Sequence, residues 1–376
     1  MSVLDRTATI QDLRNIAQRK LPRPIFDFID GAAFQEITLR ANCDDFDKIR
    51  FRQRSLVDVS KRNLSTTILG QKSSMPAVIS PCGLGGICWG NDGEKLAARA
   101  AKAADIPFTL AMLSIATMEQ IHEEIGPFWF QMCLLKDKEL MRALIGRAIS
   151  MECPVLVLTV TWAAYGLQSR SVRNAMMFPP KITPRTLWDF SKKPAWVARH
   201  FLGKRVAFNN FEGLVKDPGD LDYIVGQIDN AATWKDLEWL RSIWPGKILI
   251  KGINCAEDAR LAVEHGADGV SVSNHGGNQL DSAASTISVL PDVVRGVDGR
   301  GEVLIDGGVR SGQDILKACA HGATACLLGR GHLYGLAASG EIGVTKALEL
   351  MRYELDVSTA LTGLSEISDA STEILV

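Results

Sequence analysis

The sequence has no long hydrophobic run, no paired cysteine motif and almost no net charge. Its 376 residues contain no stretch of about 18 apolar residues, so no segment is expected to cross a bilayer. The formal net charge of -1 gives no electrostatic reason to expect nucleic acid as a partner, and the membrane signal is not firm. Residues 1–9 are polar and lack the apolar core of a secretory signal. These absences predict a cytoplasmic location.

The eight cysteines are scattered along the chain and form no CxxC pair. The pattern therefore indicates neither a disulfide framework nor a metal site. Several cysteines lie within apolar runs, so we expect buried free thiols in a reducing cytoplasm. They are Cys43, Cys82, Cys88, Cys133, Cys153, Cys255, Cys319 and Cys326.

Short apolar runs alternate with Ala-, Glu- and Lys-rich stretches from Met75 onward. Repeated alternation of this kind predicts a parallel sheet, and eight units predict a closed (β/α)8 barrel within one α/β domain, 1–376. The predicted strands are 77–80, 108–112, 129–133, 155–160, 248–252, 270–273, 303–305 and 325–328. The predicted helices include 93–104, 138–150, 234–243, 256–265, 312–320 and 342–355.

An N-terminal helical extension is expected at 1–74, before the alternating region begins. Apolar residues at helical spacing predict a helix over 10–19. A second helix is expected to begin at Pro22 or Pro24 and to end near Gly31.

One connection, 161–233, is too long for an ordinary loop after the fourth strand. On a barrel it would rise from the face that carries active sites, so we expect a loop or lid. Within it, 186–201 is rich in tryptophan and basic residues. This stretch fits either a helix on a membrane surface or, more commonly, a helix packed on its own domain.

Two side chains with catalytic chemistry lie at the carboxyl ends of predicted strands. Lys251 follows Ile248-Leu-Ile near the end of the fifth strand and should point into the mouth of the barrel. His275 follows the sixth strand within Ser273-Asn-His-Gly-Gly, and glycines there let the backbone approach a ligand. An imidazole that titrates near neutrality is a natural general base.

Glycine-rich turns follow the last two predicted strands. The seventh strand ends in Asp306-Gly-Gly-Val-Arg-Ser-Gly and the eighth in Gly329-Arg-Gly. Turns at these two positions form the phosphate site that many barrels share. Backbone N–H groups, together with Arg310 and Arg330, would suit a phosphate dianion.

The chain resembles the FMN-dependent α-hydroxy acid oxidase and dehydrogenase family, which includes glycolate oxidase, lactate oxidase and dehydrogenase, and mandelate dehydrogenase. The resemblance extends from Leu13 to about Ser368. The stretches that carry it are LPRPIFDFIDGAA, TTILGQKSSMPAVISP, FWFQ, LVLTV, IKGI, AEDARLAVEHGADGVSVSNHGGNQLD and IDGGVRSGQDILKACAHGA.

The resemblance implies FMN as the cofactor and a role for each matching residue. His275 would be the base that takes a proton from the substrate as a hydride reaches flavin N5. Lys251 would lie beside N1 and O2 and favour the anionic reduced ring. The implied cofactor-binding residues are Pro81, Cys82, Gly83, Gln131, Thr159, Lys251, Ser273, Asp306, Gly307, Gly308, Arg310, Gly329 and Arg330.

The substrate half departs from the family pattern. The family usually has tyrosine where this chain has Phe28 and Cys133, and aspartate where it has Thr161. It has arginine where this chain has Gln168 and Asn278. Paired arginines grip a carboxylate bidentately. Losing two charge-assisted bonds, at roughly 1.5–3 kcal/mol each, should weaken binding of a small carboxylate by about three to four decades.

The changed anchor leaves three functions open. The first is oxidation of a C–H bond next to a hydroxyl or amine in a neutral, larger or biosynthetic substrate, as in peptide-modifying relatives. The second is ordinary L-2-hydroxy acid oxidation, with Arg170 or Arg173 reaching in from the long loop. The third is a non-catalytic FMN-binding scaffold. Oxygen, a quinone or a carrier protein would accept the electrons, and the family resemblance implies a homotetramer or larger assembly.

Overall fold

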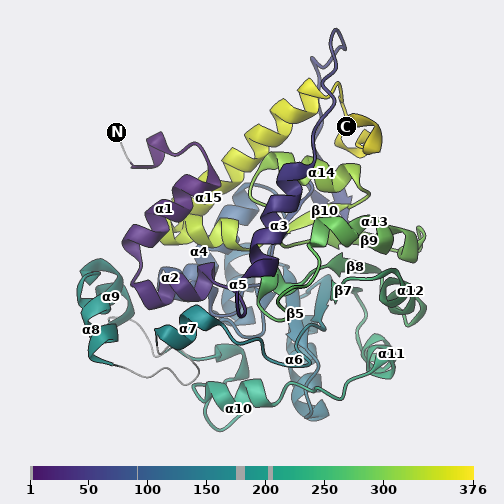
Figure 1. Cartoon of the computed structure of the whole chain (residues 1–376). Coiled ribbons are helices and arrows are strands. Elements are labelled where there is room, and N and C mark those ends of the chain that lie inside the picture. The colour runs from purple at the N-terminus through teal and green to yellow at the C-terminus, as the bar shows by residue number, and fades with distance from the viewer. Residues whose placement is uncertain (1–2, 91, 175–182, 202–205) are drawn as a thin grey trace.

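Eight parallel strands curl into a barrel at the centre of the molecule (Figure 1). This computed structural model describes residues 3–90, 92–174, 183–201 and 206–376. A bridge between Ile79 and Phe108 joins the first strand of the barrel to the second and closes the ring. The strands are β3 (Ala77–Ile79), β4 (Thr109–Ala111), β5 (Trp129–Cys133), β6 (Val155–Thr159), β7 (Lys247–Ile253), β8 (Gly269–Val272), β9 (Glu302–Ile305) and β10 (Ala325–Leu328).

The strand order is that of a (β/α)8 barrel, β3-β10-β9-β8-β7-β6-β5-β4, and so confirms the predicted fold. Each predicted strand coincides with an observed one to within a residue at either end. An antiparallel hairpin, β1 (Thr66–Ile68) and β2 (Gln71–Ser73), precedes the barrel.

Alternate residues of the barrel strands fill its interior. Because successive strand residues point to opposite faces, one set faces the barrel axis and the other faces the surrounding helices. Ile68 and Leu69 of the hairpin close the end where the strands begin, since the Leu69 N–H donates to the Glu302 carboxylate at the start of β9. The interior cluster consists of Ile68, Leu69, Val78, Trp129, Val155, Val157, Leu249, Leu304, Ala325 and Leu327.

Helices cover the outside of the barrel (Figure 1). The helices predicted from the sequence are confirmed, but α3, α5 and α13 were not predicted. The last of these contains Pro291 and Gly296, which obscure a helical pattern. The α-helices outside the long connection are α1 (Ile10–Lys20), α2 (Arg23–Asp30), α3 (Ile37–Lys48), α4 (Gly93–Ala103), α5 (Met118–Ile125), α6 (Lys138–Ser150), α11 (Trp234–Ile243), α12 (Ala256–Glu264), α13 (Thr286–Val297), α14 (Gly312–Ala320) and α15 (Arg330–Leu361).

The long connection after β6 is largely helical where it is described; residues 175–182 and 202–205 lie outside the described residues. The tryptophan-rich stretch forms two helices rather than one. Trp196 is buried and its indole N–H donates to the Ile87 carbonyl at 3.0 Å, as packing on the chain's own domain requires. Trp188 is 65% exposed. The helices are α7 (Ser169–Arg173), α8 (Pro184–Ser191), α9 (Pro194–Phe201) and α10 (Leu221–Gly226).

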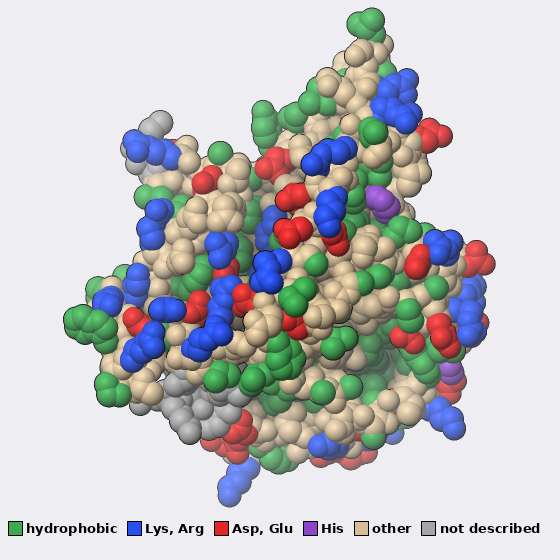
Figure 2. Space-filling view, viewed as in Figure 1, with side chains coloured by type: hydrophobic (Ala, Val, Ile, Leu, Met, Phe, Trp, Pro, Cys, Tyr) green, Lys and Arg blue, Asp and Glu red, His purple; other side chains and the backbone are tan. Residues whose placement is uncertain are grey.

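Within the described residues, none of the helices combines the length and the apolar character needed to span a bilayer. Lys and Arg side chains gather on the left of the face shown in Figure 2, over the region of α1, α2 and α8.

All eight cysteines are free, as expected. The expectation that they are buried holds for five of them and is wrong for Cys255, which is exposed, and for Cys43 and Cys82, which are partly exposed. Cys255 lies in the turn between β7 and α12, where the chain passes over the barrel rim.

The last helix, α15, bends sharply instead of running straight. Ser339 and Gly340 leave helical geometry, and Gly340 has φ +61°. This bend brings the backbones on either side together, so that a Cβ on Gly343 would lie 1.9 Å from the Gly335 carbonyl oxygen. The predicted helix 342–355 is the part of α15 after the bend.

We expect Gly343→Ala to destabilise the fold by about 2–3 kcal/mol, because two backbones must separate to admit a methyl group. Urea unfolding would measure this. Gly146→Ala in α6 is the matched control, since its Cβ would meet no atom within 4 Å. That control should stabilise the protein by roughly 0.5–1 kcal/mol through helix propensity. Equal effects of the two changes would contradict this account of the bend.

Candidate active site

A cavity of about 370 Å³ opens where the barrel strands end. Its size is that of an ordinary ligand pocket. Of the residues predicted for the site, Ser273 and Thr161 are not part of the cavity wall and instead contact residues that are. The predicted residues in the wall are Phe28, Pro81, Cys82, Gly83, Gln131, Cys133, Thr159, Gln168, Lys251, His275, Asn278, Asp306, Gly307, Gly308, Arg310, Gly329 and Arg330.

The barrel interior and the cavity wall are built by the same face of each strand. Val157 and Leu249 belong to the interior cluster, and Thr159 and Lys251 follow them two residues later in the cavity wall. A step of two residues keeps a side chain on the same face of a strand. The same step leads from Val78 to Ser80, from Trp129 to Gln131, from Leu304 to Asp306 and from Leu327 to Gly329.

Lys251 is held by two neighbours at the centre of this wall. Its Nζ lies 2.7 Å from Asp306 Oδ2 and donates to Ser273 Oγ at 2.9 Å. Both charged side chains are over nine-tenths buried. The other carboxylate oxygen, Asp306 Oδ1, is buried without a partner among the described residues. A buried acceptor without a hydrogen bond destabilises the fold unless a ligand group donates to it.

The two glycine-rich turns lie side by side at the far end of the cavity. Gly308 has φ +95°, and a Cβ there would lie 2.0 Å from the Asn42 carbonyl oxygen, so only glycine fits. A Cβ on Gly329 would meet nothing closer than 4.0 Å. Arg310 lines the same end and uses one N–H on the Val309 carbonyl. Its remaining donors are available to an anion.

Arg330 is largely committed to the protein backbone. Its guanidinium donates to the carbonyls of Ile29, Gly31 and Gly276 at 3.0, 2.6 and 2.9 Å. Three of five donors are thereby used, so Arg330 joins the end of α2 to the loop of His275 and retains two donors for a ligand.

His275 projects into the cavity from a strained turn with φ +56°. Ser273 Oγ accepts from its backbone N–H at 3.1 Å, and its Nδ1 lies 2.9 Å from Thr161 Oγ1. Burial, followed by the positive charges of Lys251 and Arg330, lowers the pKa of His275 well below its usual value. The imidazole is therefore neutral at physiological pH.

The two amides predicted to contact the substrate bind each other. Gln168 Nε2 donates to Asn278 Oδ1 at 3.0 Å, and Ser171 donates to Gln168 Oε1 at 2.9 Å. Phe28 and Cys133 line the same end. Burial raises the pKa of the Cys133 thiol to about 12, so it too is uncharged.

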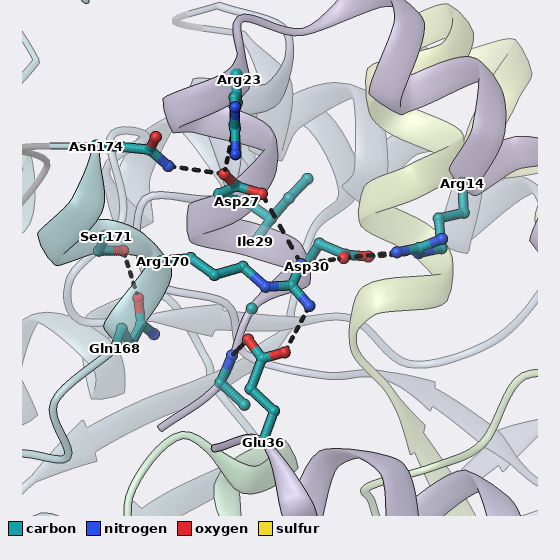
Figure 3. A network of polar contacts seen from close by, with 12 residues as sticks. Arg14, Arg23, Asp27, Ile29, Asp30, Glu36, Gln168, Arg170, Ser171 and Asn174 are labelled. Carbon is teal, nitrogen blue, oxygen red and sulfur yellow. Dashed lines mark hydrogen bonds and ion pairs between the residues drawn. The ribbon is translucent and has the colours of Figure 1, made fainter. Parts of the chain in front are cut away.

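Arg170 lies two residues from Gln168 but does not line the cavity, and its guanidinium joins a network between α7 and the end of α2 (Figure 3). It donates to Asp30 at 2.7 Å and to Glu36 at 2.6 Å. Burial alone would raise the pKa of Asp30, but hydrogen bonds from Arg14, Tyr334 and Arg170 bring it to about 2. The structure thus answers the question left open by the sequence, because neither Arg170 nor Arg173 lines the cavity.

Several cavity residues were missed from the sequence. Trp162 and Tyr165 line the wall just beyond β6, and Trp162 Nε1 donates to His275 Nδ1 at 3.3 Å. The signal was present, since Trp162 follows Thr161 directly at a strand end. Phe208, Asp222 and Val225 line the outer part, and they come from the long connection, whose path no local pattern predicts.

The place of the two glycine-rich turns makes this chain a (β/α)8 enzyme with a site for a phosphorylated cofactor. Comparison with known proteins narrows that class. The chain matches the FMN-dependent dehydrogenase family over residues 17–376, and it belongs to that family. The predicted family is confirmed, and the cofactor is FMN.

Similar proteins include the L-lactate dehydrogenase of Alcaligenes faecalis, 40% identical over 97% of each chain, and that of Caulobacter vibrioides, 40% identical over 97% of this chain and 96% of the other. Among solved structures, the monotopic membrane protein (S)-mandelate dehydrogenase matches with TM-score 0.95 at 36% identity, over 99% of both chains. An arginine-to-leucine variant of mandelate oxidase with 2-hydroxy-phenylacetamide matches with TM-score 0.82 at 33% identity, over 98% of both.

The residues present fit FMN. Asp306 Oδ1 is a buried acceptor awaiting a hydroxyl donor, and the turns at Gly308 and Gly329 with Arg310 offer donors to a phosphate. Gln131 and Lys251 would face the ring, since both line the wall between the turns and the substrate end. When bound, FMN supplies the two-electron acceptor of the reaction.

We expect Arg170→Leu to lower the free energy of unfolding by about 2–3 kcal/mol, because it removes the ion pairs that the guanidinium makes with both Asp30 and Glu36. Sulfite binding to the flavin should stay within about twofold of wild type, since Arg170 does not reach the cavity. Arg173→Leu, at an exposed position on the same helix, is the control and should change stability by less than about 0.5 kcal/mol. Weaker sulfite binding in the Arg170 variant, but not in the Arg173 variant, would show that Arg170 does help to bind an anion in the cavity.

Proposed function

We propose that this enzyme oxidises a C–H bond next to a hydroxyl or amine in a neutral or larger substrate rather than in a small hydroxy acid. The observation that carries the proposal is the paired amide of Gln168 and Asn278 at the substrate end. An amide pair binds a neutral polar group as readily as an anion, because it offers one donor and one acceptor rather than a charge. A biosynthetic intermediate would suit such a site.

The charge distribution in the cavity supports a neutral ligand. Lys251 is paired with Asp306, and Arg330 is mostly used by backbone carbonyls. Asp222, an exposed residue of the cavity wall, adds a negative charge that would disfavour a carboxylate.

The residues of this chain divide the work of the reaction between them. His275 is placed to take the proton from the substrate hydroxyl or amine, and Thr161 contacts the far side of its ring. Gln168 and Asn278 orient the substrate, and Phe28 and Trp162 exclude water from the reacting atoms. Lys251 places a positive charge beside the ring position, where negative charge develops during reduction.

Ordinary 2-hydroxy acid oxidation remains a second candidate, and the similarity to L-lactate dehydrogenases over nearly the whole chain favours it. Its carboxylate would have to bind to the amides without a free cation among the described residues of that end. Oxygen, a quinone or a carrier protein is proposed as the electron acceptor, and the cytoplasm as the location.

Matched acids and amides separate the two candidates. We expect 2-hydroxy-phenylacetamide and lactamide to reduce the flavin at least tenfold faster than mandelate and lactate, followed anaerobically by loss of flavin absorbance. Replacing both amides, as Gln168→Arg with Asn278→Arg, should reverse that preference, since two bidentate cations gain roughly 3–6 kcal/mol with a carboxylate. Faster reduction by the acids in the wild-type enzyme would favour ordinary hydroxy acid oxidation. Reduction by dithionite alone would favour a non-catalytic scaffold.

We infer also that a second copy of this chain covers a basic arm at 52–62, which projects at the top of Figures 1 and 2. Residues 52–58 are all exposed, and Leu56 is completely so. The Arg54 N–H donates to the Leu361 carbonyl at 3.0 Å, which fixes the arm to the end of α15.

The outer face of α15 continues this surface. Tyr353, Val357 and Leu361 are spaced four residues apart and all exposed, so they form one apolar stripe. A chain that carries both a basic arm and an acidic helix end complements another copy of itself. The exposed arm carries Arg52, Arg54, Lys61 and Arg62, and the helix and the segment after it carry Glu349, Glu366, Asp369 and Glu373.

We expect Leu361→Asp to convert the assembly to monomers, as measured by light scattering of the eluting protein, because a buried unpaired carboxylate costs several kcal/mol. Leu187→Asp is the control, since that leucine is 56% exposed on α8, away from the stripe. If the wild-type protein is a monomer, or if the Leu361 variant keeps the wild-type assembly, this surface is not an interface between copies of the chain.

A further inference from the structure

Two groups converge on one nitrogen of His275. Thr161 Oγ1 lies 2.9 Å from Nδ1, and Trp162 Nε1 donates to the same atom at 3.3 Å. An indole N–H is a donor only, whereas a threonine hydroxyl can donate or accept. A ring nitrogen that accepts from an indole must carry a free lone pair. The neutral imidazole therefore holds its proton on Nε2, the other ring nitrogen.

The indole is held in this position by its neighbours. Its ring centroid lies 5.8 Å from that of His275 and 6.0 Å from that of Tyr165, with an edge contact to Tyr165. The adjacent backbone is also fixed, since the Val160 N–H donates to the Lys251 carbonyl at 2.9 Å. The donor is thus directed at Nδ1 by the structure around it.

The charged groups around the ring also keep the imidazole neutral. Lys251 approaches from β7 and Arg330 from α15, and both disfavour a second proton on the imidazole. Asp306 is paired with Lys251, and the phenol of Tyr165 from the long connection is neutral at physiological pH. Among the described residues, no carboxylate is hydrogen-bonded to the ring to stabilise a proton on Nδ1.

We propose that Trp162 is a positioning residue that holds His275 with its proton on Nε2, so that the resting enzyme presents a hydrogen-bond donor to the substrate. The consequence for substrate choice rests on the proposed function: the Nε2–H of His275 would donate to the carbonyl oxygen of a neutral amide or ketone. The tautomer itself does not depend on that function.

The Thr161 hydroxyl allows His275 to leave this resting tautomer. To accept a substrate proton at Nε2, the ring must first carry its own proton on Nδ1, and the Thr161 hydroxyl must turn to accept from it. The indole N–H then loses its partner. Losing one hydrogen bond lowers the population of the base tautomer by about tenfold, so base catalysis should be limited by this exchange.

Nitrogen-15 NMR of the flavin-loaded enzyme tests the proposal without any substrate. Histidine would be labelled, and His275→Gln would assign the signal among the six histidines. We expect a protonated, pyrrole-type Nε2 and an unprotonated, imine-type Nδ1 in the wild-type protein. Protonation of Nδ1 in the wild-type spectrum would overturn the proposal, whatever the substrate proves to be.

Two variants test the role of the indole itself. Trp162→Phe keeps an aromatic ring but removes the donor, so it should move the tautomer toward Nδ1–H and raise the rate of flavin reduction by about tenfold with little change in substrate binding. Thr161→Asp should also move the tautomer toward Nδ1–H and speed flavin reduction, although the indole is still present. It should raise the pKa of His275 as well, which moves the acid limb of the pH–rate profile to higher pH.

The matched control is Trp188→Phe on α8, where the ring is 65% exposed and contacts Lys192. It should move neither the His275 signals nor the rate. If Trp162→Phe leaves the tautomer unchanged, Trp162 has no positioning role, and the wild-type spectrum decides the matter should that variant not fold.

Discussion

The inward register of the barrel strands is the constraint on which the rest of the molecule depends. A side chain on one face of a strand is followed two residues later by another on the same face. The barrel therefore has an apolar interior, with Val157 and Leu249, and directly above it a polar floor, with Thr159 and Lys251. A slip of one residue would exchange the two faces and destroy core and site together.

The two halves of the cavity are built differently as a result. The cofactor half rests on strand ends and the turns that follow them, and its ion pair between Lys251 and Asp306 is buried among rigid neighbours. The half predicted to bind the substrate is assembled from α2, the long connection and the turn after β8. The network around Arg170 (Figure 3) joins α2 to the long connection, and Arg330 joins α2 to the turn after β8. Substrate choice can therefore change without disturbing the flavin site.

The charges follow the same division. Lys251 and the phosphate turns place positive charge at the cofactor end, where an anionic ligand and a reduced ring both require it. The end predicted to bind the substrate has amides, a hydroxyl and an indole instead of charged groups, and His275 beside them is kept neutral. The residues predicted to contact the substrate thus carry no charge; they are Phe28, Cys133, Thr161, Gln168 and Asn278.

The sequence by itself determined the barrel, its strands to within a residue, and the polar residues that follow strands, because hydrophobic periodicity and glycine-rich turns are local signals. Lys251, His275 and Asp306 were found in this way. Only the tertiary structure decided which way Arg170 points and that Trp162 reaches His275. Those contacts join a long connection to α2 and to a strand end far away in the chain, and no spacing within the sequence records them.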